Sequence, residues 1–430
     1  MKFTAMLDVN VVAHETDDEV TVLLELEAPP APDTDEKRPA NTLQVVLDRS
    51  GSMAGEPLRG AVDALVDIVG RLDQRDRFGV VVFDSSAQVV VPCAPLTDKA
   101  EVVEALRSIG PGGTTDLGAG YLRGLQELRR VADASASDGG TLLIISDGHV
   151  NSGITDADRF AELATKARST GVTTSTLGYG LGYDESLLTA IARSGAGNHE
   201  FAKEPDAAGA AIAAEVDGLL NKVVQAASLT IRFSQDVQVV KLYNDLPAHQ
   251  VGDGEVLVEL GDFYAEETRK LLMVFRVPAM AALGLAEVAS LELRYVELPA
   301  LVEQSVRVPI AVNVVPGDVA AGRVADPVVH SERLYQEAQQ SKKRASEAFE
   351  SGDLLMGKHL LQTATGQLGI ASAIAPEQGR DDILRELADV EDMRTDADVL
   401  GTNHASKLSR ASYHRETTRR GRRRPKSDES

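Results

Sequence analysis

Short apolar runs alternate with amphipathic segments between about residues 42 and 224. The runs at 43–47, 78–83, 141–145 and 172–177 have the length and composition of strands that are buried on both faces. Segments with apolar residues three or four positions apart, which predict helices with one buried face, lie at 58–72, 100–109, 117–131, 157–169, 185–193 and 207–224. This alternation predicts an α/β fold with a doubly wound, mainly parallel sheet.

After about residue 225 the pattern changes to alternating apolar and polar positions. Residues 306–314, for example, carry an apolar side chain at every second position. At least five such strands are expected, at intervals suited to a β-sandwich or barrel. Two N-terminal strands, near 3–13 and 20–26, need partners for their backbone edges. Because the α/β core has its own strands, we expect these two to join the later sheet, so that the α/β domain is inserted into a β-sandwich domain.

Helical spacing returns from about residue 325. Segments 328–349 and 354–374 flank a turn that contains Gly352, and 381–400 is a candidate third helix. A single hairpin loosely resembles one tetratricopeptide-type repeat, but a stable array needs about three repeats, so we expect a packed helical appendage. The expected domains are 1–40 (N-terminal strands of the β-domain), 41–225 (α/β domain), 226–318 (remaining strands of the β-domain), 325–400 (helical hairpin region) and 401–430 (basic, disordered tail).

Composition and charge narrow the classes of partner. The chain has 430 residues, of which 43% are hydrophobic and 26% charged, and this balance excludes wholesale disorder. A net charge of −22 repels nucleic acid and anionic membranes over most of the surface. The exception is segment 407–430, with nine basic and three acidic residues. Two alternatives remain for its arginine-rich run. The run stays solvated, or folds back on the acidic body, or else it binds nucleic acid or anionic lipid.

The cysteine content and the absence of long apolar runs bear on the compartment. Cys93 is the single cysteine, so no internal disulfide can form, and we expect it to be a small buried residue. The N-terminus lacks the continuous apolar run of a signal peptide. No stretch reaches 18 apolar residues without a charge, and the longest weak candidate, 278–290, is short and contains Glu287. We therefore expect a cytoplasmic protein without a membrane span.

Oxygen-bearing side chains gather at three predicted junctions of the α/β domain. Asp48, Ser50 and Ser52 occupy alternate positions just after the first apolar run, and Gly51 allows their loop to curl. Thr115 lies just before the helix that starts at residue 117, and Asp147 follows the run 141–145. Loops at the carboxyl ends of such strands are where α/β sheets place ligands.

These residues predict a site for a hard divalent cation. Carboxylate and hydroxyl oxygens suit Mg²⁺, Mn²⁺ or Ca²⁺ rather than zinc. The serines and the threonine could bind directly, and the two aspartates directly or through water. Two carboxylates leave the dication electrophilic, so that a sixth position stays open to an Asp or Glu side chain of a protein partner.

The pattern resembles the von Willebrand factor A family over about residues 41–224. The metal-ion-dependent adhesion site of that family reads Asp-x-Ser-x-Ser, then Thr, then Asp, on three loops. The resemblance assigns the metal to Asp48, Ser50, Ser52, Thr115 and Asp147. Thr115 is preferred to Thr114, because the family's threonine directly precedes the polar residue that opens the helix. The flanking strands are similar to those of intracellular bacterial members and of inter-alpha-inhibitor-like and calcium-activated-channel-like relatives.

Other chemistry is weaker in this sequence. Gly51-Ser52-Met53-Ala54-Gly55 misplaces the serine of a hydrolase elbow by one position. His149 is expected to shape its loop rather than bind metal, and Asp84 is expected to be a capping or turn residue.

Three hypotheses about function follow. The first is a metal-dependent protein-interaction module. The second is a non-catalytic assembly subunit or adaptor of a separate AAA+ ATPase of the MoxR or chelatase type, which the family resemblance implies. The third, a metal-assisted hydrolase, lacks an evident general base, so we expect a protein that is not an enzyme.

Overall fold

The computed structural model describes residues 1–31, 40–135, 140–147, 150–179, 185–202, 222–234, 236–298 and 300–418. The chain divides into two compact units. The first comprises Met1–Ala31 and Val223–Ser430, and the second comprises Pro32–Lys222. The helix expected over 207–224 lies mostly outside the described residues, and residues 222–224 begin a strand instead.

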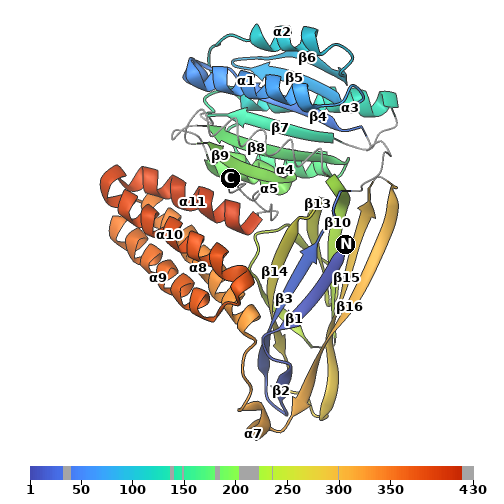
Figure 1. Cartoon of the computed structure of the whole chain (residues 1–430), viewed down its shortest axis with the longest axis vertical. Helices are drawn as coiled ribbons and strands as arrows, with labels where there is room; N and C mark the ends of the chain where they lie inside the picture. The colour runs from blue at the N-terminus through green and yellow to red at the C-terminus, as the bar shows by residue number, and fades with distance from the viewer. Residues whose placement is uncertain are drawn as a thin grey trace, which may run out of the picture. The chain divides into compact units, whose positions relative to one another are not determined.

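The second unit is built on one six-stranded sheet (Figure 1). Its strands, in spatial order, are β6 (Ala87–Pro95), β5 (Arg77–Phe83), β4 (Thr42–Asp48), β7 (Gly140–Ser146), β8 (Val172–Tyr179) and β9 (Ala196–Ala202). All neighbouring pairs are parallel except β5 and β6. The chain leaves β4 toward β5 and later resumes at β7 on its other side, so the direction of winding reverses between β4 and β7.

Helices cover both faces of this sheet because the central strands are apolar on both. The helices are α1 (Glu56–Arg71), α2 (Lys99–Arg107), α3 (Leu117–Ser135), α4 (Ala157–Arg168) and α5 (Glu185–Ser194). Val45 packs in a buried cluster with α1 and α2, whereas Val46 packs in a second cluster with α3, α4 and α5. The predicted doubly wound α/β fold is confirmed.

A β-sandwich forms the larger part of the first unit. One sheet has the order β1 (Lys2–Leu7), β3 (Asp18–Glu27), β14 (Thr268–Val277), β11 (Gln238–Leu242). The other has the order β12 (Ala248–Gly252), β13 (Glu255–Tyr264), β10 (Lys222–Phe233), β15 (Gly284–Glu297), β16 (Val302–Val315), β2 (Val11–Ala13). Strand β3 pairs with β14 over its full length, and Leu24 lies opposite Leu271. The α/β unit is therefore inserted between β3 and β10.

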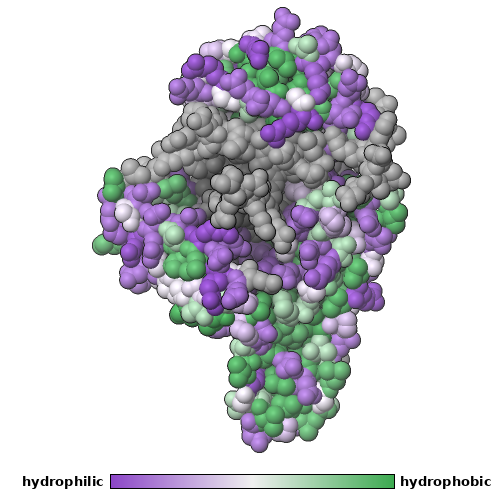
Figure 2. Space-filling view, in the orientation of Figure 1, coloured by the Kyte–Doolittle hydropathy of each residue, from purple (hydrophilic) through white to green (hydrophobic). Residues whose placement is uncertain are grey.

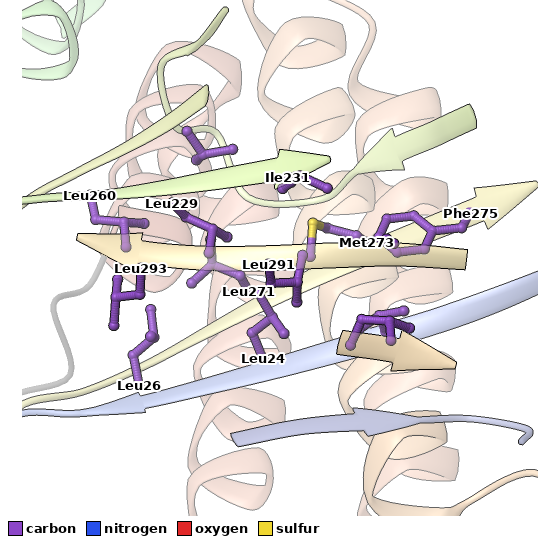
Figure 3. Close-up of a cluster of buried hydrophobic side chains, with 14 of the residues drawn as sticks. Leu24, Leu26, Leu229, Ile231, Leu260, Leu271, Met273, Phe275, Leu291 and Leu293 are labelled. Carbon is purple, nitrogen blue, oxygen red and sulfur yellow. The ribbon is translucent and has the colours of Figure 1, made fainter. Parts of the chain in front are cut away.

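The inner faces of the two sheets form one apolar core (Figure 3). Leu24 from β3, Leu271 from β14 and Leu291 from β15 are each at most 1% exposed. On β15 and β16 the outward positions carry charged or hydroxyl groups, such as the exposed Arg294 and Ser305. The alternation that predicted these strands thus reflects one packed and one solvated sheet face.

Apolar residues are also plentiful on the exposed surface near β2 and the short helix α7 (Gly317–Ala320), as Figure 2 shows. Leu285 is 82% exposed at the start of β15, and Val324, which follows α7, is 87% exposed. Segment 278–290, the longest apolar candidate for a membrane span, forms a loop and the first part of β15. Among the described helices, none combines the length and the hydropathy that a membrane-spanning segment requires.

Four long helices follow the sandwich: α8 (Pro327–Glu350), α9 (Leu354–Ile374), α10 (Glu377–Leu400) and α11 (Thr402–Thr418). The predicted turn at Gly352 has a positive φ of 84°, which favours glycine, and Asp353 caps α9. The prediction of a disordered tail over 401–430 is wrong for Thr402–Thr418. The buried positions of α11 combine Tyr413 with small residues (Ala405, Ser406, Ser409 and Ser412), so the sequence shows no apolar stripe. Residues 419–430 lie outside the described part of the chain.

Candidate metal centre

Asp48 ends the central strand β4, at the point where the winding of the sheet reverses. The carboxylate is fully buried. Its Oδ2 accepts a 2.6 Å hydrogen bond from Ser146 Oγ, and its Oδ1 accepts a 2.8 Å hydrogen bond from the backbone N–H of Ser50. Ligands of doubly wound folds bind at such a reversal, outside the carboxyl ends of the strands.

Burial gives Asp48 an unusual titration. Loss of solvent raises its pKa from 3.8 to about 6, although the hydrogen bonds from Ser146 and Ser50 act in the opposite direction. The neighbouring negative charge of Asp147 raises the pKa further. The described surroundings therefore stabilise the charged carboxylate poorly, and a cation at this point would supply the missing compensation.

Ser50 and Ser52 lie on the turn that follows Asp48. A short 3-10 helix, η1 (Gly51–Met53), brings their Oγ atoms to 3.1 Å from each other. Ser50 is buried and Ser52 is exposed. The backbone N–H of Gly51 donates a 2.9 Å hydrogen bond to the carbonyl of Gly113, which ties this loop to the second loop.

Thr115 lies on that second loop, two residues before α3. It is buried, whereas its neighbour Thr114 is exposed. The backbone N–H of Thr115 donates to Asn151 Oδ1 at 2.8 Å, and the N–H of Asn151 donates back to the carbonyl of Thr115 at 3.2 Å. Asn151 thus braces the threonine loop from beyond the third junction. Sequence reasoning missed Asn151, because no local pattern marks it.

Asp147 follows β7 directly and completes the predicted set. Its Oδ1 is buried, and no described residue gives it a hydrogen-bond partner. A buried carboxylate oxygen without a partner is costly, and such an atom is commonly satisfied by a ligand, an ion or water. Gly148 and His149 lie outside the described residues, so the expectation that His149 shapes its loop stays a prediction.

Arg49 and Asp84 form an ion pair beside these loops. Arg49 donates to Asp84 Oδ2 from Nε at 3.1 Å and from Nη2 at 3.0 Å. Asp84 Oδ1 accepts the backbone N–H of Ser86 at 3.0 Å, which confirms the expected turn role of this aspartate. Burial tends to raise the pKa of Asp84, but the Ser86 hydrogen bond and the Arg49 charge hold it below the ordinary value. The pair itself was not predicted.

The donor set fits a hard cation better than a soft one. It offers two carboxylates, from Asp48 and Asp147, with three hydroxyl side chains. Among the described residues, no group of three or more His, Cys, Asp or Glu side chains comes together as a metal cluster. Cys93 is buried on β6, as expected, and burial raises the pKa of its thiol to about 12, so it offers no thiolate ligand at neutral pH.

A family model for the von Willebrand factor type A domain matches residues 43–212. The chain contains a von Willebrand factor type A domain. All five predicted metal ligands lie inside the matched residues. Domains of this type often mediate protein–protein interactions and commonly bind a divalent metal.

Two curated relatives share this domain. The uncharacterised protein sll0103 of Synechocystis sp. is 32% identical over 178 residues, which are 41% of this chain and 41% of that protein. The uncharacterised protein YfbK of Escherichia coli is 30% identical over 203 residues, which are 46% of this chain and 35% of that protein. The chain thus spans less than half the length of either relative.

A solved structure has the same fold over nearly the whole chain. It is described as von Willebrand factor type A from Catenulispora acidiphila, with a TM-score of 0.68 and 18% identity. The match covers 90% of this chain and 89% of that one, so the shared fold extends beyond the von Willebrand factor type A domain.

Proposed function

We propose that this von Willebrand factor type A domain binds a divalent cation, and that the cation binds an acidic side chain of a partner protein. Mg²⁺ is the expected ion, with Mn²⁺ or Ca²⁺ as substitutes. The proposed ligands are Asp48, Ser50, Ser52, Thr115 and Asp147.

The observation that carries this proposal is the buried Oδ1 of Asp147, which has no hydrogen-bond partner among the residues that the structure describes. It belongs to a carboxylate close enough to Asp48 to raise the pKa of that residue. Two carboxylates that repel each other at one buried sheet edge are unfavourable unless a cation lies between them. The hydroxyls of Ser50 and Ser52 add neutral oxygens to the same edge.

The charge of this ligand set favours binding of an anion to the metal. Asp48 and Asp147 balance a dication formally, and the hydroxyl groups add no charge. Mg²⁺ takes six oxygen ligands and usually retains water, so a partner's carboxylate has a coordination position to enter. Binding through such a bridge depends on the metal, and this distinguishes it from ordinary surface contact.

The first test is calorimetric titration of the full chain with Mg²⁺ and Mn²⁺. We expect one site that is lost in Ser50→Ala/Ser52→Ala. Ser108→Ala/Ser169→Ala is a matched control, because each of these C-cap serines donates its hydroxyl to a carbonyl of the helix that it ends. Binding that persists in the Ser50/Ser52 variant would exclude these hydroxyls as ligands.

The second test concerns the partner. Proteins captured from lysate in Mg²⁺, in EDTA and by the Ser50→Ala/Ser52→Ala variant are compared. A protein bound only by the wild type in Mg²⁺, and released by mutation of one of its own acidic residues, supports the proposed bridge. If that protein is an AAA+ ATPase, the chain acts as the adaptor of such a motor.

A further inference from the structure

Arg49 lies in the sequence between the proposed metal ligands Asp48 and Ser50, but its guanidinium group pairs with Asp84. Both of its hydrogen bonds to that residue end on Oδ2, at 3.1 and 3.0 Å. The side chains are 25% and 9% exposed, so the pair is partly shielded from solvent. Asp84 Oδ1 is held separately by the N–H of Ser86. Each oxygen of the Asp84 carboxylate therefore has a fixed partner.

The Asp84 carboxylate lies against the loop that carries Thr115. A Cβ atom at Gly112 would fall 2.1 Å from Asp84 Oδ2, so this oxygen occupies the space that a side chain there would need. The carbonyl of Asp84 accepts a 2.7 Å hydrogen bond from the N–H of Asp116, and the carbonyl of Arg49 accepts one of 2.6 Å from Gly112. A third carboxylate is thus present among the loops that hold the other two.

We propose that Arg49 determines the specificity of the site by neutralising Asp84, which keeps the net charge around the cation low enough for a partner's carboxylate to bind. This inference rests on the proposed function. Without Arg49, the loops would present three negative charges to a dication. The cation would be held more tightly, and an incoming anion would meet a repulsive field. Arg49 would thereby lower the affinity for the metal and raise the affinity of the bound metal for the partner's carboxylate.

If the Arg49–Asp84 pair were only a structural clamp, the predicted effect of Arg49→Met on metal affinity would be the opposite. If the pair only held the loops together, both Arg49→Met and Asp84→Asn would weaken metal binding. In the electrostatic role, Arg49→Met leaves Asp84 unpaired and tightens Mg²⁺ binding about three- to tenfold. Asp84→Asn leaves Arg49 unpaired and weakens binding by a similar factor. The double variant returns close to the wild type.

Calorimetric titration of the full-length variants with Mg²⁺ and Mn²⁺ measures these signs. Thermal melting in EDTA verifies that each variant is folded. Raising NaCl from about 0.05 M to about 0.5 M should reduce all the differences, because salt screens charges and not loop geometry. Arg75→Met is the matched control: Arg75 also pairs with an aspartate, Asp73, but it precedes β5, whereas Asp84 follows that strand. It should leave metal affinity unchanged.

The outcomes separate the two proposals. If the wild type binds neither Mg²⁺ nor Mn²⁺, the proposed function fails and this inference fails with it. If the wild type binds but a folded Arg49→Met variant binds more weakly, the inference alone is overturned. Should Arg49→Met not fold, the salt series on Asp84→Asn decides: binding that is not weakened, or a weakening that stays the same at high NaCl, contradicts the inference.

Discussion

Ser146 Oγ donates a 2.6 Å hydrogen bond to Asp48 Oδ2, across the neighbouring parallel strands β7 and β4. This contact holds one oxygen of a fully buried carboxylate in place without neutralising it. The pKa of Asp48 stays raised, to about 6, chiefly because of burial. The carboxylate is thus oriented before any cation arrives, and its uncompensated charge lowers the stability of the metal-free protein.

The first prediction is that Asp48→Asn stabilises the metal-free protein while abolishing metal binding. The amide keeps the shape of the carboxylate but removes a buried charge, so the free energy of unfolding in EDTA near neutral pH should rise by about 1–3 kcal/mol. Urea denaturation with and without Mg²⁺ measures both effects. Asp67→Asn, on the exposed face of α1, is the control and should do neither. A loss of stability in EDTA would show that the Asp48 charge is compensated within the protein.

The second prediction concerns pH. Because the folded pKa of Asp48 is raised above 3.8, its contribution to stability is present at low pH and is lost as the pH rises through about 6. The metal-free protein should therefore lose this contribution between about pH 4 and pH 7. Added Mg²⁺ binds the ionised form, so the rise in melting temperature that it causes should grow over the same window.

Melting curves at several pH values, each recorded in EDTA and in Mg²⁺, test this dependence. Asp48→Asn should remove the pH dependence of the difference between the two conditions. A metal-induced shift that is equally large at about pH 5 and about pH 7.5 would contradict the raised pKa.

The sequence predicted what depends on short-range patterns. Asp48, Ser50 and Ser52 belong to one local motif at the end of an apolar run, and Asp147 follows another such run. The interactions that orient them are long-range. Arg49 and Asp84 are 35 residues apart, and nothing in the sequence singles out one of 66 acidic residues as the partner of this arginine. The role of Asn151 was not predicted for the same reason, because it is 36 residues from Thr115 in the sequence.

Missed elements of the fold have a similar explanation. Strand β9 contains Gly197, Asn198 and His199 and ends the order of strands that the structure describes, beside β8, so its residues lack the apolar run of a central strand. Strand β12 is exposed at every position. Helix α11 buries one large side chain, Tyr413, among small ones such as Ala405 and Ser409, and this mixture gives no hydrophobic periodicity. Apolar patterning identifies elements that bury a regular series of large apolar side chains, and the described residues of these three elements show no such series.

The third prediction concerns the discontinuous β-sandwich. Leu24 lies on β3, opposite Leu271 on β14, and its side chain is fully buried (Figure 3). Leu24→Ala should lower the free energy of unfolding of the sandwich by about 2–5 kcal/mol, through lost burial and the cavity left behind. Leu285→Ala, at a position that is 82% exposed, is the matched control and should change it by less than about 0.5 kcal/mol. Equal effects of the two variants in urea denaturation would contradict the pairing of β3 with β14.

The last prediction concerns α11 and a buried charge. Lys342 on α8 is completely buried, where its Nζ donates to Glu386 of α10 and, at 2.7 Å, to Ser412 of α11. Lys342→Met leaves Glu386 without its cation in the bundle and should destabilise the packing of these helices by about 3–5 kcal/mol. Lys342→Met/Glu386→Leu removes both charges and should recover most of that loss. Hydrogen exchange of α11 amides reports the effect, and Lys358→Met, which breaks an exposed pair with Asp398, is the control. If the double variant exchanges as fast as Lys342→Met, the loss comes from altered side-chain shape and not from an unpaired buried charge.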